Sequence, residues 1–232
     1  MNLNKIITVF IGMFFSTTGN TMESKKEDPS WTLVIQAASV ISNNSKNVVA
    51  LLESARKDNN IKTDDSVFKK EALKKFEKKC AYFDFIEEDT NLEEIPFAVF
   101  KTTMIGYGYM SYIDWKDLSS SEHMTWVLNQ LFKKVKLKNL NKTEIKNIDN
   151  SVNSILTKPY SIEKQILATN SIVKTIGEVV ANRNFRMLWC LENSDSHSFV
   201  IVKPETYQKL NNTKIGYDHE FKEPKFSLKD LE

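Results

Sequence analysis

Two apolar segments near the C-terminal end constrain the fold of this chain most strongly. Residues 186–192 (RMLWCLE) and 198–203 (SFVIVK) flank residues 193–196 (NSDS), a stretch typical of the turn in a β-hairpin. Both arms are apolar almost without interruption, and strands of this kind are usually covered on both faces. We therefore expect a hairpin inside a sheet that other elements cover on two sides.

Stretches with apolar residues at helical spacing supply the covering elements. Ser30 and Ser161 can each cap the first turn of a helix, and the serines at 119–121 with Glu122 give a third start signal. Pro159 stops one helical stretch, and a polar run at 42–47 divides another. The expected helices are residues 31–55 in two pieces, 67–76, 122–135, 145–156, 162–180 and a short helix at 204–210.

Three further segments are rich in aromatic and β-branched residues, so we expect strands at 82–86, 97–102 and 108–113. The glycines at 106 and 108 then indicate a bulge or bend inside a strand. The charged stretch 220–232 predicts a loosely packed end. The fold class is therefore α+β, with a helical N-terminal part, a mixed or antiparallel sheet, a central helical block and a closing C-terminal hairpin.

The N-terminal residues have the order of a secretory signal peptide. Lys5 precedes an apolar run, which a polar stretch follows, so we expect residues 1–21 to be a signal and residues 22–232 one α+β domain. The protein would then be periplasmic. Two alternatives remain open: translation that starts at Met22 and leaves the protein in the cytoplasm, or a buried apolar element.

Composition excludes several classes of protein. The chain has 232 residues, 41% of them hydrophobic, and this balance is ordinary for a soluble globular domain. Its formal net charge of +2 gives no reason to expect a nucleic-acid partner. The apolar N-terminal run is too short for stable membrane insertion. The sequence contains no GxxxxGK[ST], HExxH, GxSxG or CxxC motif, and we predict neither a cofactor nor a metal site.

Cys80 and Cys190 are the only cysteines, and both have apolar neighbours. In an exported protein they could form one disulfide, whereas in a reducing compartment they would stay thiols. Two buried free thiols are the equally acceptable alternative.

Candidate binding residues fall in two neighbouring segments. The first is acidic and the second is aromatic, a combination that suits a binding surface with anchors and a charged rim. The candidates are Asp84, Glu87, Glu88, Asp89, Glu93, Glu94, Tyr107, Tyr109 and Tyr112. In the same region, strand alternation places Ile113 and Trp115 on one face, which we expect to be core.

Two short motifs give the chain a resemblance to known sequences. Residues 112–117 (YIDWKD) and residues 188–196 (LWCLENSDS), followed by FVIV, resemble a family of small bacterial proteins of unassigned function. The resemblance covers roughly residues 80–217. It departs from the family at His197, where an aromatic residue is expected, and at the signal-like N-terminus. Genes for such proteins often lie beside toxin genes, so the resemblance implies an immunity role.

The functional hypothesis is therefore a binding protein that is not an enzyme. In its sharpest form it is a bacterial immunity protein that neutralises a cognate toxin or secretion-system effector by direct binding. The first alternative is a small hydrolase that uses Asp114, Asp195 and His197. The second is an envelope-associated structural protein. The oligomeric state does not follow from the sequence.

Overall fold

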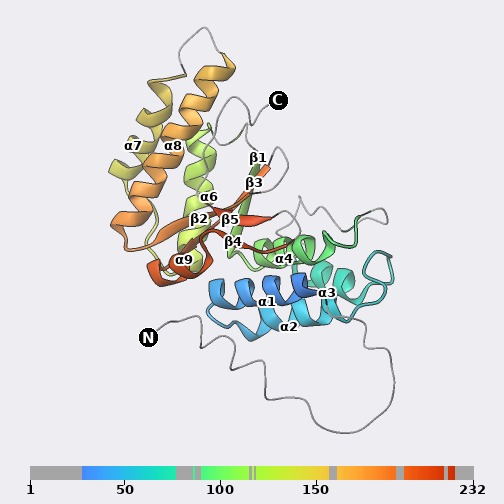
Figure 1. Cartoon of the computed structure of the whole chain (residues 1–232). Helices are drawn as coiled ribbons and strands as arrows, with labels where there is room; N and C mark the ends of the chain where they lie inside the picture. The colour runs from blue at the N-terminus through green and yellow to red at the C-terminus, as the bar shows by residue number, and fades with distance from the viewer. Residues whose placement is uncertain are drawn as a thin grey trace, which may run out of the picture.

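The structure of the chain is a computed structural model, and it describes residues 28–76, 86, 90–114, 117, 119–156, 161–191, 196–216 and 219–222. Most of the helices come first along the chain, and four of the five described strands follow Phe185, as the α+β prediction requires (Figure 1). The first part holds α1 (Pro29–Ile41), α2 (Lys46–Arg56), α3 (Val67–Phe76), α4 (Ile95–Gly106) and β1 (Met110–Asp114). The second part holds α6 (Ser121–Lys134), α7 (Lys142–Asn153), α8 (Ile162–Asn182), β2 (Arg186–Leu191), β3 (Ser196–Val202), α9 (Pro204–Leu210), β4 (Thr213–Lys214) and β5 (Glu220–Lys222).

One antiparallel sheet organises the molecule. Its strand order is β1-β3-β2-β5-β4, and every pairing is antiparallel. The expected hairpin is confirmed, because β2 and β3 pair from Arg186 opposite Val202 to Cys190 opposite Ser198. The hairpin lies in the middle of the sheet, and β1 forms one edge.

Helices cover both faces of the sheet, which explains why the hairpin arms are apolar on both sides (Figure 1). The α4 face packs against residues such as Leu188 and Val200, and α1, α2 and α3 complete that core. The α6 face packs against Trp189 and Phe199, and α7 and α8 complete the second core. Neighbouring strand residues alternate between the two cores because successive side chains point to opposite faces.

The prediction of a strand at 97–102 is wrong, because this segment lies inside helix α4. Its residues are apolar or β-branched, and most of them are buried. A helix packed on every side needs apolar residues around its whole circumference, so it loses the amphipathic pattern that identifies surface helices. Pro96 in the first turn fits a helix start, where the missing N–H costs no hydrogen bond.

The glycines that follow α4 end the helix; they do not form a strand bulge. Gly106 is the last helical residue, and a Cβ there would lie 2.5 Å from the ring of Phe76. Gly108 has a φ of 75°, which is the backbone conformation that glycine adopts without strain. The predicted strand after it is confirmed as β1, and Ile113 is buried as expected. Trp115 lies outside the described residues.

Two predictions, one about the start of the first helix and one about residues 220–222, need correction. Helix α1 is capped by Asp28, whose carboxylate accepts from the N–H of Ser30, so Ser30 is already helical. Residues 220–222 are not loosely packed, because they form β5, in which Phe221 is buried against β2. The predicted cap Ser161 is confirmed at α8, and within the start signal at residues 119–121 it is Ser120 that caps α6.

Several expectations concern residues that the structure does not describe. These are the signal peptide at 1–21 and most of the strand predicted at 82–86, of which only Ile86 is described, buried and outside any strand. Among the described residues, no helix combines the length and apolar character needed to cross a membrane.

Candidate functional site

The acidic part of the predicted binding surface is only partly described. Asp84, Glu87, Glu88 and Asp89 lie outside the described residues. The remaining two, Glu93 and Glu94, are exposed in the turn that leads into α4.

The three predicted tyrosines do not form one continuous aromatic surface. Tyr107 packs between helices: its hydroxyl donates to the carbonyl of Asn47 at 3.3 Å, and its ring meets Phe76 edge-on at 5.1 Å. Tyr112 lies in β1 and Tyr109 directly precedes this strand, and each ring has a lysine ammonium 4.0 Å from its centre. All three are half-buried. Tyr107 is therefore largely a packing residue, and only the other two belong to the edge of the sheet.

Two of the three residues proposed for a hydrolase, Asp114 and His197, come from neighbouring strands. In the β1–β3 register, Asp114 is opposite Ser196, and Ile113 is opposite His197. Asp195 lies outside the described residues. Within the described part of the chain, no group of three or more histidine, cysteine, aspartate or glutamate side chains is arranged to hold a metal ion.

Of the two cysteines, the structure describes Cys190. Cys190 is fully buried in β2, in the core below α4. Cys80 lies outside the described residues, so the disulfide stays a prediction.

A groove lined by none of these residues is the candidate site that the sequence did not reveal. It is an open hollow of about 430 Å³ where α8, β2 and α9 meet. Its apolar surface comes from Val173, Met187, Trp189 and the ring of Tyr207. A mostly apolar hollow with a few polar groups is the usual form of a binding site.

Charged side chains line the groove. Lys174 and Glu178 are exposed one turn apart on α8, and Arg186 begins β2. Among the described residues, Lys174 and Glu178 form no ion pair. Arg186 donates through Nη1 to the carbonyl of Phe185 at 2.8 Å, which uses only one of its five N–H donors. Two cations and one carboxylate therefore face the groove with most of their bonding capacity unused.

Gly177 is the unexpected residue of this site. It lies well inside the 21-residue helix α8, where glycine costs about 1 kcal/mol relative to alanine. Helical glycines are commonly explained by close packing, as at Gly106 beside Phe76. A Cβ at Gly177, by contrast, would meet no atom within 4 Å other than its chain neighbours and the nearby backbone of its own helix. Nothing packed inside the described chain requires a glycine here, and its effect is to deepen the groove.

One local signal could have pointed to this groove. A glycine between Val173 and Ala181 in a strongly periodic helix is a departure from helix propensity that calls for a reason. The rest of the lining comes from β2 and α9, which only the tertiary structure brings beside α8.

The comparisons with known proteins identify a family. Residues 46–223 match a domain of unknown function, DUF6630. No curated protein and no solved structure matches the chain. The matched range begins at the first residue of α2 and ends one residue after β5, so it contains the whole sheet and the groove. Because this range is well over half of the 232 residues, the chain belongs to the DUF6630 family.

Proposed function

We propose that this protein acts by binding a partner protein, and that the groove beside Gly177 receives a segment of that partner. The observation that carries the proposal is Gly177 itself. A glycine that weakens a long helix, and that no neighbour in the described chain requires, is accounted for if the space above it is filled in a complex.

The chemistry of the groove indicates what the segment contains. An apolar side chain would fit over Val173 and Met187, where it would lose contact with water. Lys174 and Arg186 outnumber the single carboxylate of Glu178, so the segment should also carry an acidic side chain. Arginine can hold a carboxylate through two parallel hydrogen bonds. The expected occupant is thus an apolar segment with at least one aspartate or glutamate.

The expected partner is a cognate toxin or secretion-system effector, as the sequence resemblance implies. Binding would neutralise it stoichiometrically, by covering its active site or blocking its assembly. Export directed by residues 1–21 belongs to the same proposal, because it would place the protein in the periplasm beside a toxin delivered there.

The test is a titration against any toxin whose gene lies beside the gene for this protein. Toxin activity should fall linearly and reach its minimum at one equivalent of purified protein. Gly177→Leu should fill the groove and weaken binding by at least about tenfold, since it adds a steric clash with the partner. Lys174→Glu should weaken binding less, and its effect should shrink at high salt. The matched control is Lys146→Glu, a charge reversal at an exposed position of α7 away from the groove.

Three outcomes would contradict the proposal. Protection at well below one equivalent would indicate catalysis. Binding that is unchanged in both Gly177→Leu and Lys174→Glu would remove the groove from the interface. No binding of the adjacent toxin, in a preparation that is folded by circular dichroism, would remove the immunity role.

A further inference from the structure

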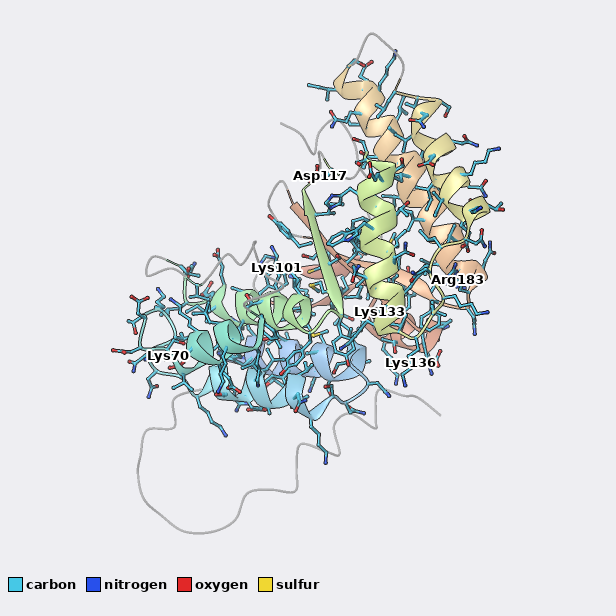
Figure 2. The ribbon with its side chains drawn as sticks, turned by 180° about the vertical axis from the view of Figure 1, so that it is seen from behind. Lys70, Lys101, Asp117, Lys133, Lys136 and Arg183 are labelled. Atoms are coloured by element: carbon cyan, nitrogen blue, oxygen red, sulfur yellow. The ribbon has the colours of Figure 1, made fainter. Side chains whose placement is uncertain are left out.

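Strand β1 presents an open edge of the sheet. Among the described residues it pairs only with β3, so the backbone groups on its other side have no strand partner there. An unpaired edge is a ready template for another strand. Helix α6 packs over β1 and β3 and runs back alongside β1 (Figure 2).

The charges along this edge have opposite signs at its two ends. At the end where β1 finishes and α6 begins lie Asp117 and Glu122, both exposed (Figure 2). At the end where β1 starts and α6 finishes lie Lys133, Lys134 and Lys136. Such a surface is complementary to its own copy turned through 180°, because the acidic end of each copy then meets the basic end of the other.

Trp126 supplies an anchor on the same surface. It is 58% exposed on the outer side of α6, and its ring meets His123 edge-on at 5.9 Å. A tryptophan this exposed leaves a large apolar area in water, and tryptophan is enriched at interface hot spots. Gln130, one turn further along α6, is also exposed.

We propose that the β1–α6 surface is occupied by a second copy of this chain. The two β1 strands pair antiparallel around Tyr112, so that Met110 of each copy is opposite Asp114 of the other. The two α6 helices then lie antiparallel on the same face of a continuous ten-stranded sheet. Two-fold dimers with one self-complementary patch are the commonest homo-oligomers.

A single two-fold axis satisfies both pairs of elements. A five-residue strand is about 17 Å long and a 14-residue helix about 21 Å, so their midpoints can share one axis. An axis at the middle of α6 brings Glu122 of one copy beside Lys133 of the other, twice per dimer. It also brings Trp126 next to Gln130 of the second copy, so the exposed ring is covered.

Lysines beside an edge strand often prevent that strand from pairing with another chain. This surface has two such lysines, Lys101 and Lys134. These lysines do not extend their charges away from the strand, because their ammonium groups lie 4.0 Å above the rings of Tyr112 and Tyr109 of the same chain. Lys134 is at the basic end, where the second copy offers carboxylates. Lys101 lies over the middle of the strand (Figure 2), where the axis brings two like charges together, and it should weaken the dimer.

The proposal is tested by sedimentation velocity of the purified full chain over a range of concentrations. We expect a monomer–dimer equilibrium. Glu122→Lys and Lys133→Glu should each raise the dissociation constant of the dimer by about tenfold, equivalent to about 1.4 kcal/mol. The double variant Glu122→Lys/Lys133→Glu should restore most of the affinity, since each copy again offers opposite charges. Lys146→Glu is the control and should leave the equilibrium unchanged.

Two further variants probe the rest of the interface. Trp126→Ala should raise the dissociation constant by about 30-fold, the effect of a hot-spot residue, with the thermal midpoint of the monomer almost unchanged. Lys101→Met should act in the opposite direction and tighten the dimer, because it removes the like charges near the axis. Circular dichroism of each variant separates loss of pairing from loss of folding.

A protein that stays monomeric up to about 100 µM overturns the proposal. That result would leave residues 82–86, for which the sequence predicts a strand, as the candidate partner of β1. A dimer that persists unchanged in Trp126→Ala and in both charge reversals also overturns it, because the interface would then lie elsewhere. The groove at Gly177 is on α8, β2 and α9, so failure of the dimer and failure of the proposed function are separate results.

Discussion

The two faces of the sheet are covered by helices of different kinds. On one face, α4 is enclosed by α1, α2, α3 and β1, and it has buried residues around its circumference. On the other face, α6 buries one stripe, which includes Leu128 and Leu131, and exposes Trp126 on its outer side. An enclosed helix has few positions that are free to vary, whereas a surface helix has one face for packing and another for binding. The candidate interaction surfaces accordingly lie on α6 and α8.

The largest expected effect tests this difference directly. Phe100, in the middle of α4, is fully buried, and Phe100→Ala should lower the free energy of unfolding by about 3–5 kcal/mol. Gln130→Ala, on the exposed side of α6, should change it by less than about 0.5 kcal/mol. Urea denaturation measures both. Similar effects of the two substitutions would show that α4 is not the more enclosed helix.

A second prediction concerns the ionic group that holds the α6–α8 face together. The guanidinium of Arg183 pairs with the carboxylate of Glu144 at 2.5 Å and donates to the carbonyls of Lys138 and Asn139. It also lies 4.4 Å from the ring centre of Phe132. Both charged side chains are less than 20% exposed, so Arg183→Ala would leave a half-buried carboxylate and two carbonyls unpaired.

Arg183→Ala should therefore cost about 2–3 kcal/mol in the free energy of unfolding. Arg183→Lys should recover only part of this loss, because an ammonium lacks the planar fork of donors. Equal stability of Arg183→Ala and the wild type would show that the cluster contributes no net stability.

Asp58 is the corresponding group on the α4 face. Its carboxylate accepts from the hydroxyl of Ser66 at 2.7 Å and from the backbone N–H groups of Asn60 and Phe68 at 3.0 Å. Burial acts to raise the pKa of Asp58, but these hydrogen bonds together hold the pKa below its ordinary value. Asp58→Asn should cost about 1–2 kcal/mol, as loss of a helix cap does.

The pH dependence has a definite sign. Because the folded pKa of Asp58 is the lower one, its stabilisation is present in full above the unfolded pKa of about 4 and is lost as pH falls through the folded value. Wild-type stability should therefore fall more steeply below about pH 4 than that of Asp58→Asn. Thermal melts across this range check the difference, and parallel curves would contradict the lowered pKa.

The last expected effect is a gain in stability. Gly177→Ala places a methyl group in open space and should stabilise the folded chain by about 0.5–1 kcal/mol, since alanine favours the helix. At Gly106 the same change should destabilise, because the new Cβ would meet Phe76 at 2.5 Å. The two glycines thus provide a matched pair for thermal denaturation. A loss of stability at position 177 would show that the glycine is needed within the chain, and would remove the main support for the groove.

The spacing of apolar and capping residues along the chain was enough to predict the elements whose contacts follow a regular one-sided or two-sided pattern. The stripe on α6, the caps Ser120 and Ser161 and the β2–β3 hairpin all follow from residues close together in the sequence. The candidate site was not predictable in this way. Its walls come from α8, β2 and α9, and only Gly177 carried a local signal.

Tertiary structure decided the remaining elements, and the reason is the same in each case. Segment 97–102 has the composition of a strand, yet enclosure by three helices and β1 makes it part of α4. Residues 220–222 look like a charged end, yet pairing with β2 makes them β5 and buries Phe221. Local sequence determines the structure of a segment when residues close by in the chain supply its hydrogen-bond partners and its packing contacts. Where a segment must satisfy them with distant partners, the partners decide its structure.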